Sequence, residues 1–192
     1  VCSWRFRYML PDGTYQYTAW GGTASAGQSF SHPLTGLSPG ATYRFAAQAR
    51  NSAGESAWGG DVSFTTSAVV PTAAAEAATN VTQTSATLNG RILQDGGAPC
   101  QYRFRYKQDP EGQVAYMWTY TAYTGSKRTG ETFSFALTGL TPGRTYRFAV
   151  QAKNSAGEGD WSAQQVFTTP KVAPPTVTTL AAQDITGTTA TL

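Results

Sequence analysis

The side chains that could perform catalysis or hold a metal are few in this chain of 192 residues. It has one histidine, His32, and two cysteines, Cys2 and Cys100. A nucleophilic triad needs a histidine beside a serine or cysteine, and a structural zinc site needs four clustered ligands. His32 falls at the end of a predicted strand, and no nucleophile motif surrounds a serine. We therefore predict that the protein is not an enzyme and binds no cofactor and no metal.

The two cysteines open equivalent motifs, "CSWRFRY" at 2–8 and "CQYRFRY" at 100–106. In an extended array of repeats they lie about one domain apart, whereas a disulfide requires Cα atoms within roughly 7 Å. We expect Cys2 and Cys100 to be small apolar residues at the start of a strand. The alternative is a disulfide from either cysteine to another chain.

The composition favours β-structure joined by many turns. Charged residues make up 13% of the chain and aromatic residues 12%, with 20 glycines and 10 prolines. The net charge of +3 is too small to indicate a nucleic-acid partner. No apolar run is long enough to cross a bilayer, so membrane insertion is not expected.

An internal repeat dominates the sequence. The segment "LTGLSPGATYRFAAQARNSAGE" at 34–55 returns as "LTGLTPGRTYRFAVQAKNSAGE" at 137–158. Within each repeat apolar and polar residues alternate, which predicts antiparallel strands with one buried and one wet face. Several short strands separated by turn signals indicate a sandwich or a barrel.

The motif Leu-x-Pro-Gly-x-x-Tyr decides for a sandwich, because its Tyr hydroxyl can hydrogen-bond back across a corner of the chain. The motif occurs twice, as Leu37, Pro39, Gly40 and Tyr43 and as Leu140, Pro142, Gly143 and Tyr146. With the "YRFAVQAKNSAGEG" that follows, the chain closely resembles the fibronectin type III family. Its "SATLNG" form resembles the variant of bacterial surface and secreted proteins. The resemblance implies an all-β fold of tandem immunoglobulin-like sandwiches with seven strands per module.

In that family, strands A, B and E form one sheet and strands C′, C, F and G form the other. Carried over to this chain, the seven strands A, B, C, C′, E, F and G fall near 72–79, 84–92, 100–107, 114–123, 131–137, 145–153 and 161–169. The family often has a tryptophan in strand B where this chain has Gly90. We expect the missing core volume to come from Tyr102, Phe104, Phe133, Phe135 and Phe148.

The modules are out of phase with both ends of the sequence. Residues 1–66 match a module without strands A and B, residues 71–169 a complete module, and residues 175–192 strands A and B of a further module. We expect either that 175–192 of one subunit completes 1–66 of the next by strand donation, or that the chain is one period of a continuous array. The candidate subunit joint comprises Thr176, Val177, Leu180, Ile185, Ala190, Leu192, Phe6 and Tyr8.

Two further surfaces could bind partners. A basic face on strands C and F carries Arg5, Arg7, Arg103, Arg105 and Arg147, and suits either an anionic polysaccharide or simple solvation. The edge strand C′ places Tyr116, Trp118 and Tyr120 on one side and Tyr123 on the other. With Trp20 of the first module, the first three form a candidate lateral interface, although aromatic residues here can also only cover the core.

These features predict a structural extracellular or cell-surface protein, a repeat unit of a filament, fibre or sheath whose partners are its own neighbours. The alternative is an adhesin stalk or a carbohydrate- or partner-binding spacer of a larger secreted protein. Fold alone does not decide between them, because type III modules serve many roles.

Overall fold

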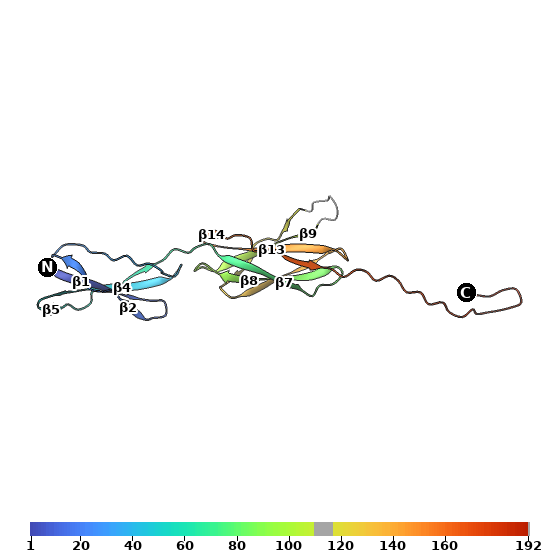
Figure 1. The fold of residues 1–192 in the computed structure, drawn as a ribbon, viewed down its shortest axis with the longest axis horizontal. Helices are drawn as coiled ribbons and strands as arrows, with labels where there is room; N and C mark the ends of the chain where they lie inside the picture. The colour runs from blue at the N-terminus through green and yellow to red at the C-terminus, as the bar shows by residue number, and fades with distance from the viewer. Residues whose placement is uncertain (110–116, 192) are drawn as a thin grey trace.

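The computed structural model describes residues 1–109 and 117–191, and all its regular elements there are β-strands. The predicted all-β class is confirmed. Figure 1 shows two bodies arranged end to end and followed by an extended stretch of chain. We call residues 1–66 the first unit, residues 71–169 the second unit and residues 175–191 the terminal segment.

The second unit is a sandwich of two antiparallel sheets. One sheet has the order β12 (Thr132–Thr138), β8 (Ser85–Gln94), β7 (Thr72–Thr79). The other has the order β10 (Thr119–Tyr120), β9 (Cys100–Gln108), β13 (Thr145–Asn154), β14 (Gly157–Glu158), with β11 (Thr124–Lys127) on β9 and β15 (Gln165–Thr168) on β13. This is the division of strands that the family resemblance implies.

The core of the second unit is built around an aromatic pair that faces Gly90. Tyr102 and Phe133 stack with ring centroids 4.0 Å apart. A Cβ atom on Gly90 would lie only 2.6 Å from the Phe133 ring, so strand β8 can approach only because glycine has no side chain there. The pair fills the space where relatives often have a tryptophan. Phe104, Phe133 and Phe148 are buried as expected, while Tyr102 and Phe135 are partly buried against them.

The two Pro-Gly motifs form matching corners. The Tyr146 hydroxyl accepts a hydrogen bond from the Thr141 amide at 2.9 Å, and the Tyr43 hydroxyl accepts one from the Ser38 amide at 2.8 Å. Both rings are buried and stack on a phenylalanine of the last strand of their unit. Each corner therefore ties the turn before its long central strand to the interior. The remaining motif residues Leu37, Pro39, Gly40, Leu140, Pro142 and Gly143 lie in or beside these turns.

The first unit has only the second of these two sheets. Its strands are β1 (Cys2–Met9), β2 (Tyr15–Tyr17), β3 (Gly21–Ala24), β4 (Thr42–Asn51), β5 (Gly54–Glu55) and β6 (Val62–Thr65). The family resemblance also implies a strand E near 28–34, but residues 25–41 form no strand. In the second unit, β12 pairs with β8 alone, and the first unit offers no counterpart of β8. A segment without a hydrogen-bonding neighbour cannot pair as a β-strand.

The terminal segment repeats the turn between β7 and β8. Asn80 and Asp184 have positive φ angles of 49° and 51°, and the Thr82–Ser85 amide-to-carbonyl bond of 2.8 Å recurs as Thr186–Thr189 at 2.7 Å. Within 175–191 the only pairing is an isolated bridge between Gln183 and Thr191, and no strand forms because no sheet lies beside the segment. Its assignment to strands A and B of a further module stays a prediction.

Candidate functional site

The outer face of β9 and β13 is a stack of alternating cations and aromatic rings. Tyr102, Phe104 and Tyr106 point toward the core, so the residues between them point outward. The Trp161 ring lies between two guanidinium groups, with the Arg103 carbon 5.2 Å and the Arg105 carbon 4.4 Å from its centroid. Two outer rings extend the stack, and each packs against two cations. Trp118 lies 4.6 Å from Arg105 and 5.0 Å from Lys107. Tyr123 lies 4.4 Å from Arg103 and 4.2 Å from Lys153. We call this arrangement the ladder.

The first unit repeats the ladder with different residue types. Trp58, at the position of Trp161, lies between Arg5 at 5.3 Å and Arg7 at 4.9 Å. The outer rings are Trp20 over Arg5 at 4.5 Å and Tyr15 over Arg7 at 5.0 Å. A cation held between two rings gains from the quadrupole of both, and more so when water is excluded. The Nε atoms of Arg7 and Arg105 are both buried without a hydrogen-bond partner among the described residues, as the enclosure by rings requires.

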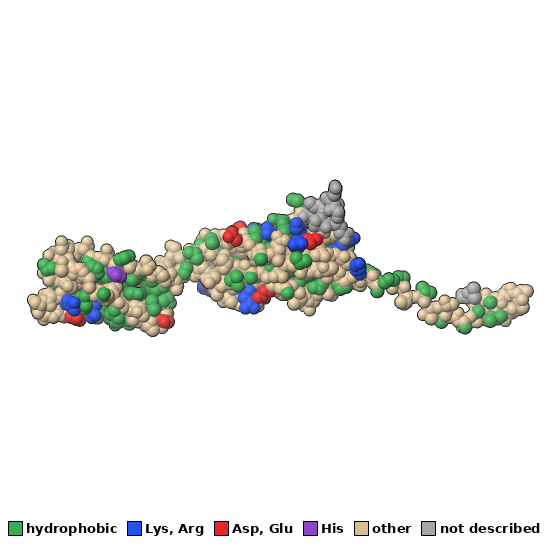
Figure 2. All heavy atoms as spheres, viewed as in Figure 1, with side chains coloured by type: hydrophobic (Ala, Val, Ile, Leu, Met, Phe, Trp, Pro, Cys, Tyr) green, Lys and Arg blue, Asp and Glu red, His purple; other side chains and the backbone are tan. Residues whose placement is uncertain are grey.

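The predicted basic face is a mixed face rather than a free positive surface. Four of its five arginines are paired with carboxylates: Arg5 with Glu55, Arg7 with Asp61, Arg103 with Glu158 and Arg147 with Asp109. The buried side chains of Gln48 and Gln151 also accept hydrogen bonds from Arg5 and Arg103. Figure 2 shows blue and red side chains adjoining on both units. An anionic ligand therefore has to compete with the protein's own carboxylates.

The candidate lateral interface belongs to the same ladder. Trp118 and Trp20 pack on cations, and Tyr120 lies 5.7 Å from the Arg103 guanidinium and remains 51% exposed. Tyr116 lies outside the described residues. Tyr123 was expected on the side opposite Trp118, yet both rings cover the ladder. The alternation breaks at Thr121, whose side-chain oxygen accepts the Phe104 amide at 2.9 Å.

Sequence reasoning missed the two central rings, Trp58 and Trp161. Both lie in loops before the last strand of a unit, outside every run of alternating residues. Their signal is that both follow the repeated "NSAGE" at an equal distance, opposite two outward arginines.

The residues of the candidate subunit joint are not brought together within one chain. Phe6 and Tyr8 line an open hollow of about 260 Å³ on the first unit, together with His32, Leu34, Leu37, Phe45 and Phe64. Of the remaining candidates, Thr176, Val177, Leu180, Ile185 and Ala190 are exposed in the terminal segment, and Leu192 lies outside the described residues. In the register of the repeated turn, Val177 corresponds to the buried Ala73, but Leu180 corresponds to Glu76, which pairs with Arg91 on the outer face.

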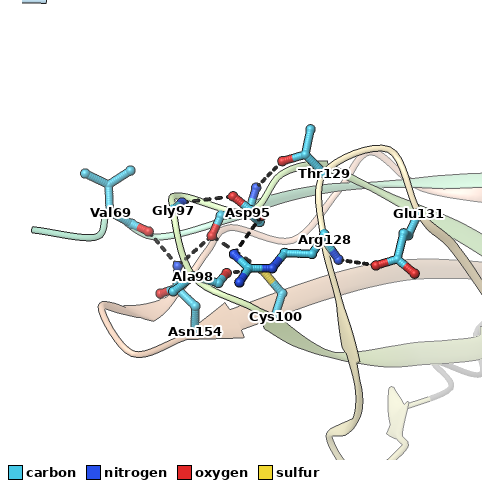
Figure 3. A network of polar contacts seen from close by, with 9 residues as sticks. All are labelled: Val69, Asp95, Gly97, Ala98, Cys100, Arg128, Thr129, Glu131 and Asn154. Atoms are coloured by element: carbon cyan, nitrogen blue, oxygen red, sulfur yellow. Dashed lines mark hydrogen bonds and ion pairs between the residues drawn. The ribbon is translucent and has the colours of Figure 1, made fainter. Parts of the chain in front are cut away.

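The two units meet at a close contact between backbone segments. A Cβ atom on Gly40 would lie 2.3 Å from the Gly97 carbonyl oxygen, and one on Gly97 would lie 2.2 Å from that of Pro39. The linker amide of Val69 donates to the Gly96 carbonyl at 3.0 Å. Asn154 Nδ2 donates to the carbonyls of Val69 and Asp95 at 2.7 and 2.8 Å (Figure 3). This contact between glycines was not foreseen from the sequence.

Asp95 shapes the turn that receives the first unit. Its side chain accepts the Gly97 amide at 2.9 Å and pairs with Arg128 at 3.4 Å (Figure 3). Burial alone raises the pKa of this carboxyl, but these hydrogen bonds outweigh it and hold the pKa below its ordinary value. Asp95 thus stays charged, and its contribution is lost only as pH falls through that lowered pKa.

Cys100 is buried in the same region, with its Sγ 3.5 Å from the carbonyl oxygens of Asp95 and Ala98. Burial raises the pKa of its thiol to about 11. A disulfide from Cys100 to another chain is therefore not supported, because the sulfur is neither exposed nor ionised. Cys2 is partly exposed, and both cysteines are free.

The described residues contain no cluster of three or more metal-ligating side chains. They also include no helix with the length and apolar character that crossing a membrane requires.

Replacing Arg105 with lysine tests the ladder. Arg105→Lys keeps the charge but loses the flat surface that stacks between Trp118 and Trp161, so we expect a loss of about 1 kcal/mol in the free energy of unfolding. Urea denaturation followed by circular dichroism measures it. The matched control Arg91→Lys, at an exposed ion pair, should change stability by less than about 0.5 kcal/mol. Equal effects at both sites would show that the stacking adds nothing.

Alkylation by iodoacetamide at pH 8 tests the two cysteines. With a pKa of about 11, only about one Cys100 thiol in a thousand is ionised at this pH. We expect Cys100 in the folded protein to react on the order of 100 times more slowly than Cys2. Peptide mapping by mass spectrometry gives both rates, and in 8 M urea (roughly full unfolding) they should converge. Similar rates in the folded protein would contradict the burial of Cys100.

Comparison with known proteins agrees with this architecture. The model of the fibronectin type III domain matches residues 71–168. Fasciclin-2 of Schistocerca americana is 37% identical over 83 residues, which cover 42% of this chain and 8% of that protein. Endoglucanase B of Cellulomonas fimi is 34% identical over 133 residues, which cover 65% of this chain and 12% of that protein. The chain thus spans only a small part of these relatives.

Two solved structures align with parts of the chain. The sensor domain of the anti-sigma factor RsgI4 of Pseudobacteroides cellulosolvens aligns with a TM-score of 0.42 and 20% identity, over 57% of this chain and 99% of that one. The chicken CNTN1 FN1–FN3 domains align with a TM-score of 0.36 and 19% identity, over 88% of this chain and 56% of that one. With the family model covering half of its residues and the paired sheets and tyrosine corner in place, the chain belongs to the fibronectin type III family.

Proposed function

We propose that this chain is a structural part of a larger extracellular protein, in which fibronectin type III modules follow one another end to end as a stiff fibre or spacer. The observation that carries the proposal is the joint between the units. There the turn at Pro39 and Gly40 lies directly against the turn at Gly96 and Gly97, with no side chain between them.

Such a contact favours one relative orientation of the units. The linker is fixed at both ends, since the Gly40 amide of the first unit donates to the Ser67 carbonyl at 3.2 Å, and Val69 is hydrogen-bonded to Gly96 and Asn154 of the second unit. A backbone surface cannot adapt by changing rotamers, so a tilt of one unit either opens a gap or causes a clash. A chain of modules joined in this way resists bending at each joint.

Strand donation, in which one module supplies strands to the sheet of another, is a more specific version of this proposal. The first unit leaves part of the inner face of its sheet open as a hollow, while the terminal segment carries the turn that in the second unit connects the two covering strands. We propose that a hairpin of this kind from a neighbouring module covers the sheet of residues 1–66. Main-chain pairing then links the modules, and apolar contacts with Phe6 and Tyr8 stabilise the link.

A second candidate function is a spacer beside a carbohydrate-active domain. Tyr17 and Tyr120 keep 56% and 51% of their surface exposed on the ladder, where a sugar ring could stack. The similarity to part of an endoglucanase fits such a place in a larger protein. A spacer of this kind does not need to self-associate, whereas a fibre does. The experiments below distinguish the two.

Matched glycine variants test the joint. Gly40→Ala and Gly143→Ala impose a similar backbone strain, at φ of 62° and 70°. Only the first brings a methyl group against backbone of the other unit, because the nearest atom at Gly143 is the flexible Lys171 side chain. We expect one alignment tensor to fit residual dipolar couplings of both units in the native chain and in Gly143→Ala, but not in Gly40→Ala. Independent tensors in the native chain would overturn the stiff joint.

Charged substitutions in the terminal segment test strand donation. We expect the native chain to form head-to-tail oligomers whose mass, measured by light scattering, rises with concentration. Val177→Asp should shift the protein to monomer, because it places a carboxylate at the position of buried Ala73. Thr178→Asp, at the neighbouring outward position, should leave the oligomers unchanged. A monomeric native chain would exclude donation between chains and favour the spacer.

A further inference from the structure

The edges of a β-sheet carry backbone groups without a partner, and proteins protect them against pairing with another chain by short strands, irregular register or charge. Most edge strands of the second unit have such protection. β7 carries Glu76, and its register with β8 shifts at two places. β11 has a shift in its register and ends at Lys127, while β10 and β14 have only two residues each and β15 has four. Each of these edges offers a neighbouring chain little regular backbone.

β12 is an edge strand without any of these protections. Its seven residues, TFSFALT, pair with β8 in one unbroken register. The stretch has no charged residue, no proline and no glycine. A long, flat and uncharged edge of this kind is a template for pairing with another strand. The side chains on its outward face are small and exposed: Thr132, Ser134, Ala136 and Thr138.

The free edge of β12 presents the backbone groups of alternate residues. The Ile92 amide donates to the Glu131 carbonyl at 3.0 Å, so this pair is hydrogen-bonded across the two strands. Bonded and non-bonded pairs alternate along an antiparallel ladder. Phe133, Phe135 and Leu137 therefore bond to β8, while the residues between them direct their amides and carbonyls away from it. Among the described residues, none of those outward groups has a hydrogen-bond partner.

A second copy of β12 fits this edge in one register. Antiparallel pairing about a two-fold axis at Phe135 places Thr132 opposite Thr138 of the copy. It also places Ser134 opposite Ala136, so that each outward amide meets an outward carbonyl. No charges repel each other, because no side chain of the paired strands is charged. The strand is thus complementary to itself.

A hollow beside Phe135 favours the same axis. An apolar hollow of about 220 Å³ lies between β12 and the edge of the other sheet. Phe135 lines this hollow and is only partly buried. Two-fold pairing at this residue brings the two rings together as a cross-strand aromatic pair, at a position where opposite side chains lie closest. The rings then shield each other and the hollows beside them from water.

We propose that β12 is a lateral contact surface for a second copy of this chain, which pairs with it antiparallel about Phe135. The three-stranded sheets of the two chains then form one continuous sheet, and the chains run in opposite directions. Such a contact is two-fold and closes with two copies, so it joins chains in pairs and does not grow. It depends only on the second unit, because residues 25–41 of the first unit form no strand. This pairing and the head-to-tail link can therefore fail independently of each other.

The pairing is weak between free chains and becomes effective between chains that are held side by side. One strand edge buries less than the roughly 1,200 Å² at which specific interfaces become stable. Chains already held together by other contacts form it as an effectively intramolecular step. A covalent trap, rather than the mass in solution, is therefore the measurement that detects it.

Disulfide trapping tests the register. Thr132→Cys and Thr138→Cys are each made in a chain whose partly exposed Cys2 is replaced by alanine, and equal amounts, one of them isotope-labelled, are mixed in a glutathione buffer. In the proposed register these two positions face each other, whereas the two copies of Thr132 lie roughly 20 Å apart. We expect mass spectrometry to show the mixed disulfide in at least about tenfold excess over either homodimer. A mixed disulfide no more abundant than random collision gives would overturn the pairing.

Two substitutions at position 136 test whether the backbone edge carries the contact. Ala136→Pro removes an amide that faces the free edge, which an edge strand tolerates, and so blocks pairing with a second strand. Ala136→Val keeps the amide and adds similar bulk. We expect the proline variant to reduce the mixed disulfide to the level of random collision and the valine variant to leave its excess unchanged, with native circular dichroism spectra for both. An excess that persists in Ala136→Pro would show that the chains do not pair through β12.

Discussion

A β-sheet with one apolar face must bury that face, and the rest of this structure follows from that requirement. In the second unit, β7, β8 and β12 cover β9 and β13, and the result is a continuous core with Phe104 and Phe148 at its centre. In the first unit the same sheet lacks this cover, and the segment around Phe30 remains without strand pairing although its ring keeps the equivalent stacking partner. Phe30 thus packs on the sheet through its ring although its backbone forms no strand.

The opposite, outward face of each sheet carries charged side chains, and these are stabilised differently from the apolar face. Its outward arginines pack on aromatic rings, pair with carboxylates, or do both, so much of their charge is satisfied within the module. The pattern is kept while its members change, since Trp20 corresponds to Tyr123 and Tyr15 to Trp118. What the two units share is an alternation of cation and ring, and any aromatic residue of suitable size satisfies it.

The sequence predicted most of what depends on local pattern. Alternation located β9 and β13 closely, and the Leu-x-Pro-Gly-x-x-Tyr spacing located both corners. It did not reveal features that depend on contacts through space. Trp161 reaches the ladder from an irregular loop. Tyr123 lies on the other side of its strand than the alternation predicts, because Thr121 interrupts the alternation by bonding to Phe104. Gly96 and Gly97 look like ordinary turn residues in the sequence, which does not show that Pro39 and Gly40 lie against them. The missing strand in the first unit shows the same limit, because strand pairing needs a hydrogen-bonding neighbour, which a local pattern does not reveal.

The repeated turn at Asn80 and Asp184 has a consequence for how such modules form. It closes through hydrogen bonds between residues three apart, and it keeps its geometry in the terminal segment where no sheet supports it. Contacts this local form on the microsecond scale of hairpin closure, far faster than the pairing of distant strands. During synthesis, the bend between the first two strands of a module can therefore exist before the strands that will face it have left the ribosome.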